Sequence, residues 1–230
     1  MSALDQVTET GPLPIPLTVK PRLRGWLHAY AAVLSVASGA TLIAVATALR
    51  GHRAGVSTAV YAVTVTALFS TSALYHRIPW QARGHAVMKR LDHSMIFVFI
   101  AGTYTPIAVL TLPRASAVVV LVVVWTGALF GVALQSAWPD APRWLSVPCY
   151  VGLGWVAVFV MPQLLHAGIT PLVLVIVGGL LYTVGAIVYG LKRPNPSPAV
   201  FGFHEVFHLC TLLAAVCHYI AIWFAVFTVS

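Results

Sequence analysis

Residues 203–229 read FHEVFHLCTLLAAVCHYIAIWFAVFTV, and two histidines, His204 and His208, stand four positions apart at the start of this stretch. On a helix this spacing places both imidazoles on one face, one turn apart. There they can share one metal ion such as zinc, with nitrogen–metal bonds of about 2.0–2.1 Å. The remainder of the stretch is apolar enough to cross a bilayer, where histidines are costly to keep without a role. The alternative is a solvated, inert pair at the membrane–water interface.

The composition is that of a polytopic membrane protein. Of the 230 residues, 60% are hydrophobic and 8% are charged, whereas soluble domains have roughly 45–50% apolar and about 25% charged residues. The net charge of +8 could suggest a nucleic-acid partner, but the charges lie between apolar segments, as cytoplasmic loops of membrane proteins do. We therefore expect no nucleic-acid partner. The three cysteines lie in apolar segments without a C-x-x-C pattern, which indicates packing residues.

Seven apolar segments follow one another along the chain, each close to the roughly 20 residues that a helix needs to cross the bilayer. They cover about 26–49, 56–76, 92–112, 116–135, 144–165, 171–191 and 203–229. We predict an all-α fold, a bundle of seven transmembrane helices in one domain (21–230) after a flexible tail (1–20).

The distribution of basic residues predicts the orientation of this bundle. With the N-terminus in the cytoplasm, ten of the 13 lysines and arginines fall on the cytoplasmic side. The other three, Arg50, Arg53 and Arg114, fall outside. This bias places the N-terminus inside and the C-terminus outside.

In this topology four metal-competent side chains from three helices lie at one depth, near the cytoplasmic boundary. His76 ends the second span, Asp92 begins the third, and His204 and His208 begin the seventh. His76 could supply a third nitrogen to a metal, and Ser72 lies one turn deeper on the same face. Asp92 could bind the metal or a water on it, or it could simply be a helix N-cap.

Residues 204–208 also match H-E-x-x-H, in which the glutamate activates the water of a zinc protease. A membrane protease of this kind needs an aspartate ligand in a later span, and none follows Glu205. We interpret Glu205 as a residue that stabilises the helix N-terminus. His218 lies about 21 Å along the helix from His204, too far to share its metal, and is expected to be a buried hydrogen-bonding residue. His28 is expected at the interface, and His93, about a quarter-turn away from Asp92 on a helix, is left out of the site.

Together, Ser72-x-x-x-His76, LDHS with Asp92, and His204-x-x-x-His208 resemble the hemolysin III family. This is the bacterial branch of the progestin and adipoQ receptors, which include the adiponectin receptors, and the resemblance covers almost the whole chain. It implies a zinc ion held by His76, His204 and His208, with Asp92 on a zinc-bound water. Ser72 would lie just outside the ligands, so Asp92 and Ser72 are the candidate catalytic residues.

The related alkaline ceramidases imply zinc-dependent hydrolysis of a membrane lipid amide or ester in a bacterial plasma membrane. Three neutral imidazoles leave one zinc position open, as in catalytic sites. The family name instead implies a cytolysin that forms pores, although no span has a sustained polar stripe. A third hypothesis is a receptor-like membrane-homeostasis protein, in which a structural zinc joins the second and seventh spans.

Overall fold

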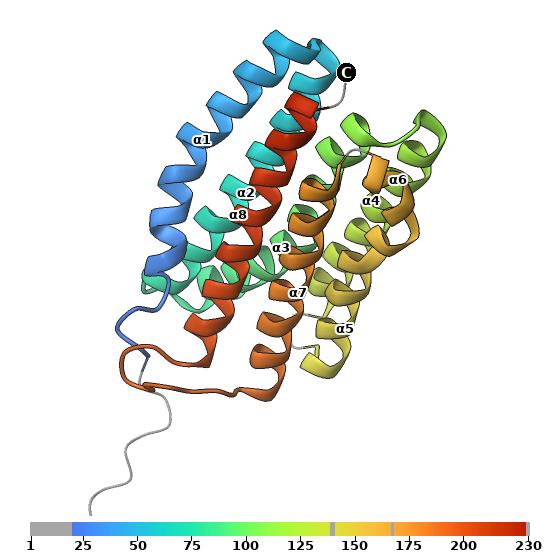
Figure 1. Ribbon diagram of the computed structural model, residues 1–230. Coiled ribbons are helices and arrows are strands. Elements are labelled where there is room, and N and C mark those ends of the chain that lie inside the picture. The colour runs from blue at the N-terminus through green and yellow to red at the C-terminus, as the bar shows by residue number, and fades with distance from the viewer. Residues whose placement is uncertain (1–19, 139–140, 167, 229–230) are drawn as a thin grey trace, which may run out of the picture.

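The computed structural model describes residues 20–138, 141–166 and 168–228, and this part of the chain forms a bundle of helices (Figure 1). Seven helical stretches are long and apolar enough to cross a membrane, which confirms the predicted all-α, seven-span fold. The predicted tail 1–20 lies, except for Lys20, outside the described residues. The elements are α1 (Trp26–Arg50), α2 (His52–Arg77), α3 (Ala82–Thr111), α4 (Arg114–Ala137), α5 (Arg143–Gly154), η1 (Trp155–Val160), α6 (Met161–His166), α7 (Ile169–Leu191) and α8 (Phe203–Thr228).

The third helix begins ten residues before the predicted start of its span, at Ala82 rather than at Asp92. Hydropathy marks where a helix enters the apolar layer, and the charged turns before that point are good helix formers that continue it outward. Arg83 and Arg90 are exposed on this extension. Asp92 therefore lies in the third turn of α3, and its interpretation as a helix N-cap is wrong.

The fifth span is broken, although one continuous helix was predicted over 144–165. α5 ends at Gly154, a 3-10 segment follows from Trp155 to Val160, and α6 completes the crossing. Such a break frees backbone groups that must be satisfied inside the bilayer. Tyr104 of α3 satisfies two of these groups, because its hydroxyl donates to the Gly154 carbonyl (2.5 Å) and accepts from the Ala157 N–H (2.7 Å).

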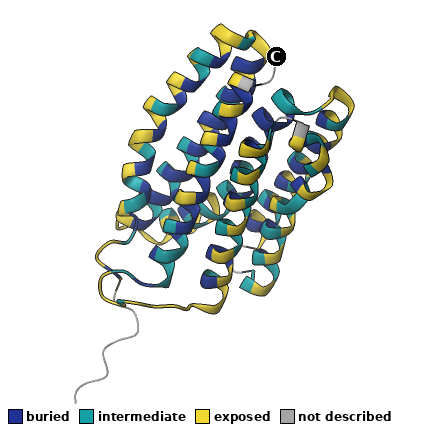
Figure 2. Ribbon diagram, in the orientation of Figure 1, coloured by how far each residue is buried: buried dark blue, intermediate teal, exposed yellow. Residues whose placement is uncertain are grey.

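Helices α2, α3 and α8 form the inside of the bundle. Their membrane segments are 50–56% buried, whereas those of the other spans are 17–28% buried. α2 packs between α1 and α3, and α8 packs against α1, α3 and α7. Figure 2 shows the exposed residues on the outer side of α1 and α7. The residues predicted to hold a metal all come from the three inner helices.

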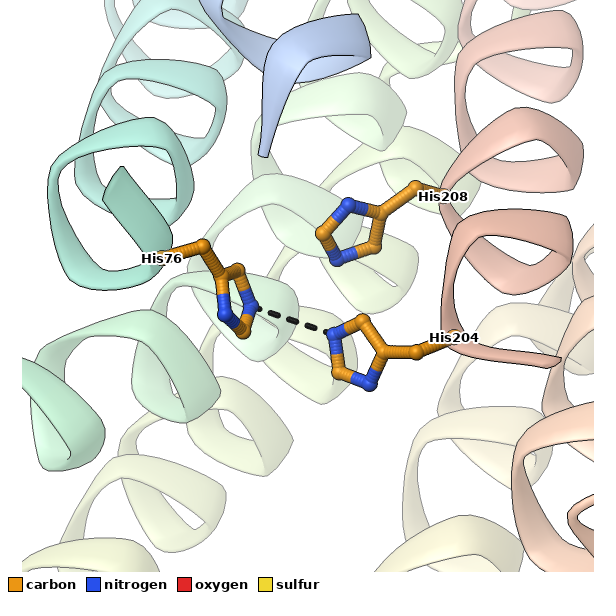
Figure 3. A group of neighbouring side chains, drawn as sticks. All are labelled: His76, His204 and His208. Carbon is orange, nitrogen blue, oxygen red and sulfur yellow. Dashed lines mark hydrogen bonds between the residues drawn. The ribbon is translucent and has the colours of Figure 1, made fainter. Parts of the chain in front are cut away.

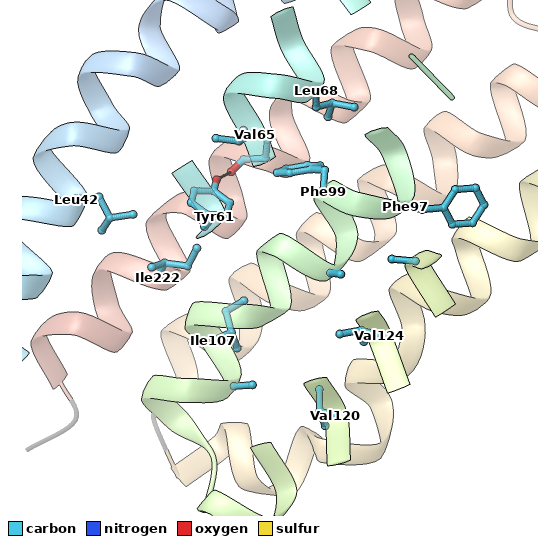
Figure 4. Close-up of a cluster of buried hydrophobic side chains, with 14 of the residues drawn as sticks. Leu42, Tyr61, Val65, Leu68, Phe97, Phe99, Ile107, Val120, Val124 and Ile222 are labelled. Atoms are coloured by element: carbon cyan, nitrogen blue, oxygen red, sulfur yellow. Dashed lines mark hydrogen bonds between the residues drawn. The ribbon is translucent and has the colours of Figure 1, made fainter. Parts of the chain in front are cut away.

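The apolar core lies between these helices (Figure 4). Tyr61, Phe97, Leu42 and Ile222 are among its largest fully buried side chains. Gly131 of α4 lets that helix approach α3, since a Cβ there would lie 2.3 Å from the Phe97 ring. This is the close helix packing that small residues permit in membranes.

Candidate metal centre

His76, in the last turn of α2, meets His204 and His208, in the first turns of α8, and the three rings turn toward one another (Figure 3). One nitrogen from each ring lies within 4.8 Å of the other two, and the Nε2 atoms of His76 and His204 are 3.1 Å apart. Ligands bonded at 2.0–2.1 Å around a tetrahedral zinc are separated by about 3.3 Å. The three residues are therefore close enough together to hold a zinc ion, and their nitrogens are donors that zinc prefers.

Burial separates these histidines from a solvated interfacial pair. His76 is 7% exposed and His208 is 3% exposed, while His204 is partly exposed. Buried polar rings need partners to offset the loss of water. A shared metal ion would satisfy one nitrogen of each of the three rings.

Asp92 approaches the triad from α3. Its Oδ2 lies 3.9 Å from Nε2 of His76, which is beyond hydrogen-bond distance, so the carboxylate lies beside the triad without a direct bond to this ring. Ser72 borders the same small cavity as this carboxylate. The helices therefore bring all five predicted site residues together: Ser72, His76, Asp92, His204 and His208.

His93 lies closer to the site than its helical position suggested. Its Nδ1 is 4.0 Å from Oδ2 of Asp92 and 2.7 Å from the Lys89 carbonyl. Together with His204 and His208 it borders a small cavity beside the triad. The expectation that His93 lies outside the site is wrong.

His28, expected at the interface, is a buried neighbour of the triad. Its ring is 3% exposed and stacks on His208, with ring centroids 3.9 Å apart and an interplanar angle of 13°. Within the described ranges, neither of its nitrogens has a hydrogen-bond partner of good geometry. The predicted topology places the start of α1 on the side of the membrane where α2 ends and α8 begins, but it does not predict the contact with His208.

Gly25 explains how α1 comes so close to the triad. Its φ is +80°, a conformation that glycine adopts without strain. A Cβ at this position would lie 2.9 Å from the Cβ of His76. The glycine thus seats the start of α1 directly on the end of α2.

Glu205 does not face the triad as a protease base would. It is 1% exposed, pairs with Arg24, and accepts a hydrogen bond from the Gly202 N–H (2.8 Å). The carboxylate therefore caps the N-terminus of α8, as predicted. Backbone hydrogen bonds from Arg22 to Ala199 and from Leu23 to Val200 also join the segment before α1 to the segment before α8. This geometry argues against the H-E-x-x-H protease interpretation.

One cavity borders the triad and a second lies behind it. The smaller, of about 30 Å³, is bordered by the triad residues His204 and His208 together with Asp92. It has room for about two waters, since one water needs roughly 10–15 Å³. A larger, mainly apolar cavity of about 110 Å³ lies deeper in the bundle. The two share the wall formed by Leu68, Ile96, Tyr150, Phe207 and Thr211.

Comparison with known proteins supports the resemblance found in the sequence. A family model described as "Haemolysin-III related" matches residues 17–219, which include every candidate site residue. The chain is 32% identical over 164 residues to "Hemolysin-3" of Bacillus cereus, covering 70% of this chain and 74% of that protein. It is also 32% identical over 142 residues to "Hemolysin-3 homolog" of Bacillus subtilis (strain 168), covering 60% and 65%.

Proposed function

Because the chain belongs to the haemolysin-III-related family and is a multi-pass protein of the bacterial cell membrane, we propose that it is a zinc-dependent hydrolase of a membrane lipid amide or ester. One observation carries the proposal: three histidine nitrogens gather within 4.8 Å beside a carboxylate. The apolar cavity that shares a wall with this site supports a lipid substrate.

The residues divide the chemistry of hydrolysis among them. His76, His204 and His208 would hold zinc, which supplies a Lewis acid for the substrate carbonyl and lowers the pKa of water to about 7. Asp92 would orient the attacking water and take its proton. Ser72, which borders the same cavity as Asp92, would help to position that carboxylate.

The access of the substrate follows from the position of the site. The triad lies at one end of the bundle, while the larger, mainly apolar cavity extends along α3, α7 and the broken fifth span. An acyl chain in this cavity would leave its polar linkage at the triad. The apolar lining would keep competing water out of the cavity.

The proposal is tested by fatty-acid release from a ceramide-type amide and a phospholipid ester by the purified protein in nanodiscs. We expect release that depends on zinc and is lost in His208→Ala. His52→Ala is the matched control, because His52 is exposed at the opposite end of α2. Equal release by His208→Ala and the wild type would contradict a catalytic role for the triad.

The names of the relatives favour a second candidate, a cytolysin. Both matched Bacillus proteins are named hemolysins, so the chain could lyse membranes directly. Dye release from liposomes separates the two functions. Lysis that persists in His208→Ala would favour a pore, whereas fatty-acid release that requires His208 favours the hydrolase.

The origin of the three ligands favours a third candidate, in which zinc is structural. Because His76 lies on α2 and the other two on α8, a metal ion would join two inner helices of a receptor-like protein. Stabilisation by zinc without turnover of either lipid would support this candidate.

A further inference from the structure

The larger cavity is apolar over most of its wall but carries a pair of polar residues, Tyr182 of α7 and His218 of α8. His218 lies ten residues beyond His208, which at 1.5 Å per residue is about 15 Å along α8. The pair is therefore well separated from the triad and plays no part in holding a metal there.

His218 is 8% exposed, and its ring is fitted against α7. Its Nε2 lies 3.3 Å from the Val175 carbonyl. Gly178 makes room for the ring, since a Cβ there would lie 2.4 Å from the same nitrogen. Val175, Gly178 and Tyr182 stand three and four residues apart, so they share one face of α7.

The unpaired atoms of the two side chains define what the pair can bind. Because a carbonyl only accepts, Nε2 of His218 carries the hydrogen, and Nδ1 of the neutral ring is then an acceptor. Nδ1 and the Tyr182 hydroxyl are both buried and lack a hydrogen-bond partner among the described residues. The two rings are neighbours, with centroids 5.6 Å apart.

A hydroxyl group complements this pair. It can donate to Nδ1 of His218 and accept from the hydroxyl of Tyr182. A carboxylate or a ketone offers no hydrogen to Nδ1, and an ammonium group would be costly to bury in an apolar cavity.

We propose that Tyr182 and His218 form a subsite that recognises a hydroxyl group on the hydrocarbon chain of a bound lipid. The proposal extends the proposed function, and rests on it only in taking the occupant of the cavity to be an acyl chain. The linkage to be cleaved would lie at the triad and the hydroxyl about half a membrane helix away. The subsite would thus select hydroxylated chains over plain ones.

The test is binding of octadecanoic acid and of its hydroxylated isomers, measured by displacement of a fluorescent fatty acid from the purified protein. We expect one mid-chain isomer to bind about tenfold tighter than the plain acid. Tyr182→Phe, which removes one oxygen, and His218→Leu should bind the plain acid as the wild type does and lose the preference. Tyr61→Phe is the control, because Tyr61 is buried outside the cavity.

The proposal is overturned if no isomer is preferred, as would follow if a water satisfied the pair, or if the preference survives in Tyr182→Phe. Should His218→Leu fail to fold, Tyr182→Phe decides alone. The same measurement in His208→Ala keeps the two proposals apart. If His208→Ala keeps the preference for the hydroxylated isomer, and neither the wild type nor any variant releases fatty acid, the subsite is retained and the hydrolase is rejected.

Discussion

Three imidazoles packed together inside an apolar bundle lose their hydration and need other partners. The Nε2 atoms of His76 and His204 face each other at 3.1 Å, so without a metal one of them must donate to the other. His208 lies against both rings. With a cation between the three nitrogens, none of them has to donate to another, because each can direct its lone pair at the metal.

Asp92 is expected to act on the reaction rather than on metal binding. Its carboxylate lies 3.9 Å from His76, so Asp92→Asn should keep the zinc content while removing a proton acceptor. General-base catalysis contributes roughly a hundredfold to ten-thousandfold, and kcat for lipid release should fall within that range. Turnover at the wild-type rate in Asp92→Asn would reject this role, and loss of zinc would make Asp92 a ligand instead.

Sequence patterns predicted the site residues whose roles depend on spacing and topology, and missed those that depend on packing. His204 and His208 follow from a four-residue spacing, and His76 from the side of the membrane on which α2 ends. The position of His28 could not be read from its neighbours in the sequence. Its stacking on His208 depends on how closely α1 approaches α2.

At the level of the elements, a buried ion pair fixes the start of α8. Arg24, just before α1, pairs with Glu205, which also caps α8 through Gly202. This contact joins the first and last spans at the triad. The triad geometry therefore depends on residues that take no part in metal binding.

Removing one partner of this pair should destabilise the protein. Glu205→Gln leaves the Arg24 charge unpaired, and breaking a buried pair typically costs about 3–5 kcal/mol. Because Arg24 is 20% exposed, we expect the lower end of this range, measured as the loss of unfolding free energy in detergent. The double variant with Arg24→Gln should recover part of the loss. If Glu205→Gln were as stable as the wild type, the pair would have no structural role.

The number of spans followed from hydropathy, but two of their shapes did not. Average hydropathy is insensitive to the polar helical turns before Asp92, so the predicted start of α3 was too late. It is equally insensitive to the 3-10 break after Gly154, because Trp155–Val160 is fully apolar. The break depends on a partner distant in sequence, the hydroxyl of Tyr104.

Tyr104→Phe should weaken the broken span. It leaves the Ala157 N–H without its acceptor and removes a donor from the Gly154 carbonyl. An unsatisfied buried group costs about 1–3 kcal/mol, so thermal unfolding should occur at lower temperature. Tyr30→Phe is the control, because Tyr30 is 64% exposed. Equal unfolding temperatures for the two variants would show that the hydroxyl does not support the break.

On the scale of the whole molecule, the candidate metal centre lies at one end of three inner helices, while the outer helices present apolar side chains. Exposed Val33, Val119, Phe130 and Phe159 are typical of this outer surface. Such a surface suits lipid chains. The larger, mainly apolar cavity, which shares a wall with the small cavity at the triad, is an internal space where a lipid chain could lie.

The orientation of the bundle remains a prediction of its basic residues. The triad end carries Arg83 and Lys192, so we expect it to face the cytoplasm. In a variant without native cysteines, a cysteine at position 83 should react with an impermeant thiol reagent only after the cells are opened. A cysteine at position 114, at the other end of the bundle, should react in intact cells. The reverse pattern would invert the topology.

Zinc per chain in the purified protein, measured by mass spectrometry of the metal beside His76→Ala, tests the metal centre most directly. His76 is the informative position, because it alone brings the second span to the two histidines of the last. One zinc per wild-type chain and a large loss of zinc in His76→Ala are the expected results. A wild-type protein purified without zinc, or equal zinc in both proteins, would contradict a metal ion shared by His76, His204 and His208.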